Sequence, residues 1–313
     1  EVFEIASRET SIEFENNRLK RAETVERAGL AVRVIAKGRI GFATSSLPAD
    51  RAGLLDQALA TAAFGKEAGF VFPGPSRSPE IEVFDRTVIG ISPEELVAYG
   101  EDLIDPLRAA DPKFKSAVSL TTAVATASLT NTAGFAGEVT KTIFGGSAGG
   151  ILVEGENFLD LTEGYFSCRR QDNLRPLRDR VLTHLRQGRV NVTLPSGKYP
   201  VVFAPSAAAS LLGPILACLN GKAVEKEASP WRGRLGEEVF SSAFTLVDDP
   251  LLPYAPATAS FDAEGVPGAR TPLIDRGVVR NFLVDLDTAA ALKMKPNGNG
   301  RRGGWSSPPA PGA

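Results

Sequence analysis

The sequence predicts an α+β protein in which antiparallel and mixed sheets pack against helices in two to three subdomains. One observation is the alternation of polar and apolar residues in segments such as 11–23 and 117–131, which is typical of strands. A second is the spacing of apolar residues by three or four positions in segments such as 54–62, which is typical of amphipathic helices. A third is the composition, since 43% apolar and 23% charged residues are ordinary values for a globular chain of 313 residues.

Two hairpins are predicted near the start of the chain, and together they form a small antiparallel sheet. Residues 11–23 indicate a hairpin that turns at the Asn-Asn pair 16–17, because Asn tolerates the left-handed backbone of tight turns. Residues 29–45 indicate a second hairpin, which turns at the Lys-Gly pair 37–38. We therefore expect the polypeptide to begin with paired strands rather than with a helix.

Helices are predicted after this sheet and in the central part of the chain. Residues 48–64 predict an amphipathic helix on the sheet, and the proline-rich residues 70–80 predict a connector at a subdomain boundary. Residues 91–111 predict a second helix, and residues 174–188 a third that ends at its last glycine. The start of the second helix has the pattern of a capping box with proline at the first helical position, made by Ser92, Pro93 and Glu95.

Between the central helices, segments rich in Thr, Val and Ser predict strands at 117–131, 138–145 and 150–155. Gly134 and the run Gly145–Gly150 lie between them, and we expect both to form turns.

The last third of the chain is predicted to hold short strands, a buried helix and a hairpin. Residues 199–221 carry no charged side chain, but three prolines interrupt them, so we expect a strand at 199–205 and then a buried helix rather than a membrane span. Ser206 is the expected N-cap of that helix, which extends to about Asn220. The remaining expected features are a strand-like segment, a Gly- and Pro-rich loop, a hairpin and a short helix, at 244–250, 261–272, 272–285 and 288–294.

These features predict three subdomains, at 1–75, 90–190 and 196–313. We expect the third to be truncated, because the sequence ends in the Ser-, Pro- and Gly-rich composition of a loop.

The charge and cysteine content argue against several classes of function. A net charge of −2 without a basic cluster is unlike a nucleic-acid-binding protein, whose affinity comes mostly from phosphate contacts. Two cysteines fifty positions apart, at 168 and 218, form no Cys-x-x-Cys motif and fit the reducing cytoplasm.

Few residues are candidates for catalysis, and for most of them packing is the favoured interpretation. His184, the single histidine, lies in an arginine-rich helix without an evident partner. Cys218 lies on an apolar helix, and Cys168 is expected to pack at a strand end although two arginines follow it. Asp262 and Glu264 could serve acid–base chemistry, a metal or a helix terminus, or could belong to a surface turn, and both alternatives stay open.

Several stretches together resemble the TldD/PmbA (TldE) family, whose members are often called modulators of DNA gyrase. They are GLAVRVIAKGRIGFATSS, GKYPVVFAPSAAASLLG, RLGEEVFSSAFTLVDDP, FDAEGVPGARTPLIDRGVVRNFLVDLDTAAALKM and NGNGRR. The resemblance covers nearly the whole chain and is most specific from Gly197 to Arg302. It implies a role in a cytoplasmic metallopeptidase, and relatives extend further at both ends, which agrees with the expected truncation.

In TldD-type members of the family, a helix carries His-Glu-x-x-x-His, in which two histidines bind zinc and the glutamate polarises water. The matching positions here are Gly213, Pro214 and Cys218, which cannot supply the two histidines or the glutamate. The resemblance therefore implies the PmbA/TldE branch, with no cofactor bound by this chain and with zinc held by a TldD-like catalytic partner in a heterodimer or higher oligomer. The implied substrates are small or unfolded polypeptides, and neither direct nucleic-acid binding nor membrane attachment is expected.

Two other hypotheses remain. The chain could be a regulatory protein of the DNA gyrase or toxin–antitoxin pathway without a peptidase role. It could also be an active metallopeptidase with unusual ligands drawn from Cys218, His184, Asp262 and Glu264. Within the first hypothesis, the residues Asp262, Glu264 and Gly265 form the candidate cleft or substrate-contact loop.

Overall fold

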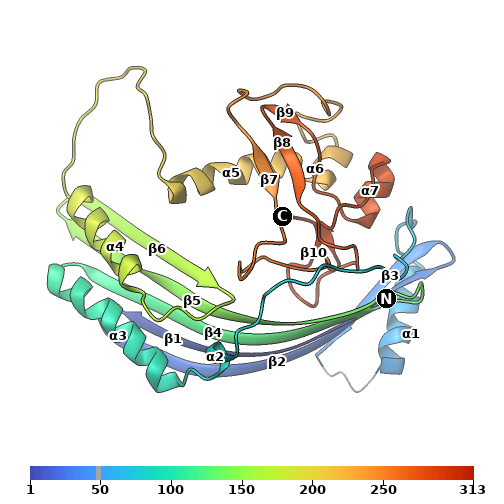
Figure 1. Cartoon of the computed structure of the whole chain (residues 1–313), viewed down its shortest axis with the longest axis horizontal. Coiled ribbons are helices and arrows are strands. Elements are labelled where there is room, and N and C mark those ends of the chain that lie inside the picture. Colours follow the sequence, from blue (N-terminus) through green and yellow to red (C-terminus); the bar gives the residue numbers. More distant parts are fainter. Residues whose placement is uncertain (47–50) are drawn as a thin grey trace.

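The computed structural model describes residues 1–46 and 51–313, and its largest element is one curled antiparallel sheet (Figure 1). Its six strands pair in the order β3-β2-β1-β4-β5-β6. The helices α3 (Pro93–Ala110) and α4 (Arg175–Gly188) pack on one face of the sheet. The C-terminal part of the chain contacts the other face, where Phe261 lies against Gly137. The strands are β1 (Val2–Glu15), β2 (Arg18–Ala36), β3 (Arg39–Ser45), β4 (Lys115–Thr130), β5 (Ala136–Glu154) and β6 (Asn157–Ser167).

Both predicted hairpins at the start of the chain are confirmed. Asn16 and Asn17 take positive φ angles of 51° and 67° in the first turn, and Lys37 and Gly38 take 50° and 75° in the second. The two hairpins share β2, which runs without interruption and pairs with β1 on one side and β3 on the other. The strands are longer than predicted, because β1 also pairs with β4 over nearly its whole length.

The predicted turn at Gly145–Gly150 is wrong, since this run lies inside the single long strand β5. The glycines are there because neighbouring strands approach closely. A Cβ on Gly146 would lie 1.8 Å from the carbonyl oxygen of Ser119, and one on Gly149 would lie 1.9 Å from that of Leu161. The edge strand that follows, β6, ends one residue before Cys168, which agrees with the strand end expected there, but the sequence prediction gave this strand no bounds.

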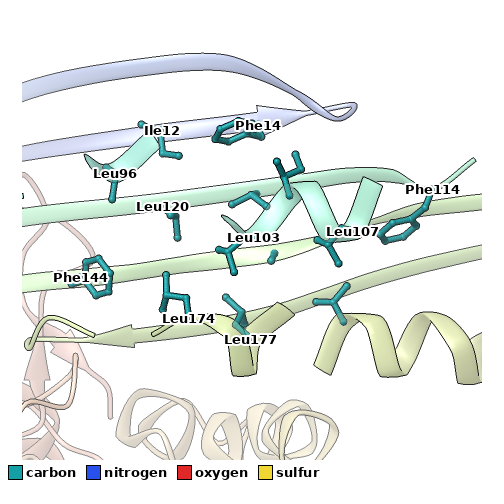
Figure 2. Packing of buried hydrophobic residues seen from close by; sticks show 14 of the residues in the cluster. Ile12, Phe14, Leu96, Leu103, Leu107, Phe114, Leu120, Phe144, Leu174 and Leu177 are labelled. Carbon is teal, nitrogen blue, oxygen red and sulfur yellow. The ribbon is translucent and has the colours of Figure 1, made fainter. Parts of the chain in front are cut away.

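The main core lies between the sheet and the helices α3 (Pro93–Ala110) and α4 (Arg175–Gly188), both of which are confirmed predictions. The side chain of Ser92 caps α3 by accepting a hydrogen bond from the Glu95 backbone N–H, with Pro93 as the first helical residue. Apolar side chains of both helices meet those of four strands (Figure 2). The labelled members of this core are Ile12, Phe14, Leu96, Leu103, Leu107, Phe114, Leu120, Phe144, Leu174 and Leu177.

A second helix layer covers the other end of the sheet. The helix predicted at 48–64 is α1 (Arg51–Ala62), and the first three predicted residues lie outside the described part of the chain. Leu54 and Ala58 of α1 are buried against Leu30 and Val32 of β2. The short helix α2 (Arg86–Ile89) follows the connector, whose residues 69–85 have no regular secondary structure.

The C-terminal part forms a small layer with its own apolar cluster. The predicted hairpin is confirmed, and it turns at Arg276 and Gly277, whose φ angles are 47° and 81°. The helix predicted at 288–294 is present but begins two residues earlier. The elements are α6 (Gly221–Glu225), β7 (Leu246–Asp248), β8 (Thr271–Asp275), β9 (Val278–Val279), α7 (Leu286–Leu292), β10 (Gly300–Arg301) and β11 (Ala310–Pro311).

The segment that precedes this layer differs from the prediction in three respects. The strand expected at 199–205 does not form, because no strand in the described residues pairs with it. The helix α5 (Pro205–Leu219) has Ala204, not Ser206, at its N-cap, since Pro205 occupies the first helical position. The helix is also not buried, because Leu219 at its C-terminal end is its one fully buried residue among those described.

The predicted α+β class is confirmed. The strands of all described sheets pair antiparallel, and the isolated bridge between Asn220 and Leu283 is parallel. The division into 1–75, 90–190 and 196–313 stays a prediction, and the six-stranded sheet crosses its first two parts. Within the described residues, no helix has the length and apolar character that a membrane crossing requires.

Candidate functional site

The helix that the sequence resemblance matches to the metal helix of TldD-type members is α5, which joins the long loop after α4 to the C-terminal layer (Figure 1). Gly213 and Pro214 lie on its exposed surface, and a Cβ on Gly213 would meet no atom within 4 Å. Cys218 is half-buried one turn later, and its carbonyl oxygen accepts a hydrogen bond of 2.6 Å from the hydroxyl of Ser229. These positions therefore present one sulfur atom and no other side-chain ligand.

A zinc ion does not fit this helix. A catalytic zinc needs about three protein ligands, and an N, O or S donor is absent at two of the three positions. In residues 1–46 and 51–313, no group of three or more His, Cys, Asp and Glu side chains is placed to hold a metal ion. The hypothesis that Cys218, His184, Asp262 and Glu264 converge on one metal is therefore wrong for this structure.

His184 and Cys168 each contact a residue in the folded chain, and neither is placed with the other candidate catalytic residues. The Nδ1 atom of His184 lies 3.2 Å from a carboxylate oxygen of Glu163 on β6, so this histidine has a partner that the sequence did not indicate. The Sγ of Cys168 contacts the carbonyl oxygen of Ala255 at 3.4 Å, and burial raises the pKa of the Cys168 thiol. A buried thiol with a raised pKa is a poor nucleophile, and the predicted packing role of Cys168 is confirmed.

Asp262 holds the turn of the candidate loop together. It is 3% exposed, and its Oδ1 accepts hydrogen bonds of 2.9 Å from the backbone N–H groups of Glu264 and Val266. Its Oδ2 accepts another from the N–H of Gly300 at 2.9 Å. Gly265 occupies the left-handed position of this turn, with φ at 85°. The Asp262 carboxylate thus satisfies three backbone donors and connects the loop to β10.

Glu264 belongs to a buried network of charges that joins distant parts of the chain. It is fully buried, and its Oε1 accepts a hydrogen bond of 2.6 Å from Arg33 of β2, while its Oε2 accepts one of 2.6 Å from the N–H of Leu286. Arg33 also donates to Glu1 at 2.7 Å, and Arg302 donates to the other oxygen of Glu1 at 3.0 Å. We call Glu1, Arg33, Glu264 and Arg302 the buried charge network.

Aromatic rings enclose both arginines of this network. The Arg33 guanidinium lies 5.3 and 5.2 Å from the ring centroids of Phe70 and Phe72 in the connector. The Arg302 guanidinium lies 4.8 Å from that of Phe3. The face of an aromatic ring attracts a cation, so these rings compensate in part for the hydration that each buried guanidinium group loses. The buried charge network therefore ties the sheet and the connector to the C-terminal layer.

Burial dominates the electrostatics of the two carboxylates. It raises the pKa of Glu264 to about 7, against the opposing effect of Arg33, and the nearby Asp262 raises it further. Burial also raises the pKa of Asp262, and it lowers the pKa of Arg302 to about 10. A carboxyl group with a pKa near neutrality can exchange a proton at cellular pH, but Glu264 has no exposed surface through which a substrate could reach it.

The sequence-predicted loop is thus present, but its carboxylates point inward. The surface-turn alternative is wrong for the side chains of Asp262 and Glu264, and contact of this loop with substrate stays a prediction. Sequence reasoning missed Arg33 and Arg302 as functional or structural residues. One feature of the sequence could have indicated Arg33: it is a charged residue within the otherwise apolar strand segment 30–36.

Two family models match the chain, at the same ends that the buried charge network joins. Residues 1–63 match PmbA/TldA metallopeptidase domain 1, and residues 196–313 match the PmbA/TldA metallopeptidase C-terminal domain, together more than half of the chain. The chain belongs to the PmbA/TldD family. The resemblance in the sequence is therefore confirmed, and the matched C-terminal domain includes α5 and the Asp262–Glu264 loop.

Relatives of this PmbA/TldD family protein extend beyond it. It is 27% identical to an uncharacterized protein of Methanocaldococcus jannaschii, over 98% of this chain and 72% of that protein. It is 26% identical to a metalloprotease of Methanothermobacter thermautotrophicus, over 94% of this chain and 66% of that protein. The crystal structure of TldE from Thermococcus kodakarensis superposes with a TM-score of 0.85 at 25% identity, over 100% of this chain and 73% of that one.

Proposed function

We propose that this chain is the non-catalytic subunit of a TldD/TldE-like metalloprotease complex of the cytoplasm, which cleaves small or unfolded peptides. The proposal rests on the helix α5, because the family resemblance matches Gly213, Pro214 and Cys218 to the metal ligands and general base of TldD-type members, and these residues cannot supply that chemistry. The similarity to TldE over the whole chain supports the same assignment.

In this proposal the zinc belongs to a TldD-like partner, and this chain contributes binding surface. A metallopeptidase cleaves its substrate with a water that a bound metal polarises, and the described residues of this chain contain no group of three or more side chains placed to hold a metal. Its own residues would orient an extended peptide and, through the buried charge network, hold the C-terminal layer against the sheet. The gyrase name of the family then reflects peptides cleaved by the complex rather than contact with DNA.

Exposed apolar side chains around α5 support a role with a partner. Val202 and Phe203 before the helix are 96% and 52% exposed, and Leu211 within it is 48% exposed. Large apolar side chains that a folded chain leaves exposed in one segment favour an interaction site there. Val190, Val192, Leu194 and Val201 in the preceding loop are also mostly exposed.

The test is reconstitution with a TldD-like subunit that carries the His-Glu-x-x-x-His motif. We expect the two proteins to co-elute and to hydrolyse an unfolded peptide faster than the catalytic subunit alone. Substitution of Val202→Asp with Leu211→Asp is expected to abolish co-elution, whereas Phe64→Asp, at a residue that is 94% exposed after α1, is the matched control. Lack of association with any catalytic homologue would refute the proposal.

Elemental analysis separates the remaining hypotheses. The purified chain is expected to hold well below one equivalent of zinc, because α5 lacks the ligands. Near one equivalent would instead favour an active metallopeptidase whose ligands differ from the set Cys218, His184, Asp262 and Glu264. Co-purification with a topoisomerase and with no peptidase would favour the regulatory role.

A further inference from the structure

One edge of β5 is left open next to the C-terminal layer. The edge strand β6 pairs with β5 from Phe144 to Glu154, so it does not cover residues 136–143. The connector reaches this edge at Thr142, whose N–H donates to the carbonyl oxygen of Val83 at 3.0 Å. Backbone groups two and four residues earlier in a strand point the same way. The backbone groups of Thr140 and Glu138 therefore also point to the open edge, where they have no hydrogen-bond partner in the part of the chain that the structure describes.

The open edge forms one wall of a groove of about 600 Å³. Its wall from β5 extends from Ala136 to Thr140, and the opposite wall consists of Ser76 and residues 78–84 of the connector. Phe261, which begins the Asp262–Glu264 loop, lines the groove together with Tyr254. We call this space the β5 groove. An unpaired strand edge beside an extended wall has the geometry that a peptide needs to add as a further strand.

The charges of the β5 groove favour a basic occupant. Glu80, Glu82 and Glu138 line it and are exposed, and none of the three forms an ion pair within the described residues. Its lining contains no lysine and no arginine. Exposed carboxylates without a cation partner lower the electrostatic potential of the groove and attract lysine or arginine side chains.

An adjoining groove of about 920 Å³ has unpaired charges of the opposite sign. It shares Phe84 and Tyr254 with the β5 groove, and Arg86 and Arg169 line it without an ion pair to any described carboxylate. A peptide that extends through both grooves would therefore be favoured in one direction, with its basic side chains in the β5 groove and an acidic group beyond Tyr254.

Tyr254 stands where the two grooves meet, and its backbone is strained. Its φ angle of 56° is unusual for a bulky residue. Three hydrogen bonds hold it there: its N–H donates to Glu82 at 2.7 Å, and its carbonyl oxygen accepts from the backbone of Cys168 at 2.8 Å and from the hydroxyl of Ser167 at 3.1 Å. Strain that surrounding contacts maintain is concentrated at binding sites, which favours a role for this ring in contacting a ligand.

We propose that the β5 groove binds an extended peptide with lysine or arginine at alternate positions, which pairs through its backbone with residues 136–140 of β5. Alternate side chains of such a strand face the same way, so its basic residues lie between Glu138 on the β5 wall and Glu80 and Glu82 on the opposite wall. The inference deepens the proposed function, because the bound peptide is then the substrate segment that this subunit presents to its partner. Binding itself requires no partner.

The test uses the isolated protein and a fluorescein-labelled hexapeptide of alternating Lys and Val, followed by fluorescence anisotropy. Saturable binding is expected, together with much weaker binding of the Glu–Val hexapeptide. The double variant Glu80→Gln/Glu138→Gln is expected to weaken binding about tenfold, from two surface charge pairs. Glu101→Gln, at an exposed helix residue without an ion pair among the described residues, is the matched control and is expected to bind as the wild type does.

A second probe separates strand pairing from simple charge attraction. The same Lys–Val hexapeptide with N-methyl groups on alternate amides loses the donors that pair with the β5 edge, and it is expected to bind at least about tenfold more weakly. Equal binding of the methylated peptide, or equal loss in the Glu101→Gln control, would overturn the inference. Peptide binding without hydrolysis in the reconstituted complex would retain the groove and refute the proposed function.

Discussion

Replacement of the buried carboxyl group by an amide, Glu264→Gln, tests the electrostatics of the buried charge network. Burial raises the pKa of Glu264 in the folded protein to about 7 from its ordinary value of 4.5. Below pH 4.5 the carboxyl group is protonated in both states. Between these two values the unfolded chain has lost the proton that the folded protein still holds, so rising pH favours unfolding.

The expected size of this effect follows from the two pKa values. They differ by about 2.5, and each unit is equivalent to about 1.4 kcal/mol, so the wild type should lose about 3 kcal/mol of unfolding free energy from this group. The loss levels off as the pH rises through about 7, because Glu264 then ionises in the folded protein as well. A glutamine at this position cannot titrate, and the variant should lack this part of the pH dependence.

The assay is urea unfolding followed by circular dichroism, at intervals from pH 4 to 8.5, for the wild type and Glu264→Gln. The difference in unfolding free energy between the two proteins isolates Glu264, since Asp262, whose pKa is also raised, titrates in both. Glu101→Gln, on the exposed face of α3, is the control and should follow the wild-type profile. Parallel profiles for wild type and Glu264→Gln across this range would refute the reasoning.

Three further predictions concern folding stability, each measured by urea unfolding. Arg33→Met leaves buried carboxylates without their cation and should cost about 3–5 kcal/mol, whereas Arg8→Met, in a side chain that is 64% exposed, should cost less than about 1 kcal/mol. Gly146→Ala places a Cβ 1.8 Å from a carbonyl oxygen and should cost about 1–3 kcal/mol, whereas Gly213→Ala in open space on α5 should stabilise the protein by about 0.5–1 kcal/mol. Ser92→Ala removes the cap of α3 and should cost about 1 kcal/mol.

Features that depend on neighbouring residues could be predicted from the sequence. The turn at Asn16 and Asn17 and the cap at Ser92 were predicted correctly, because each depends on the backbone preference or hydrogen bond of a few adjacent residues. The glycine run in β5 was misinterpreted, because glycines that form a turn and glycines that admit a close neighbouring strand have the same sequence.

The candidate site also combines features that the sequence alone determines with features that depend on distant segments of the chain. The sequence by itself determined the family and the absence of histidine and glutamate at Gly213 and Pro214, since these are matters of residue identity. Only the tertiary structure decided that Glu264 is buried against Arg33, two residues 231 positions apart. It also decided that β6 ends before it covers the first part of β5, which leaves the β5 groove open. Burial and strand pairing depend on contacts between segments distant in the chain, and no local pattern records them.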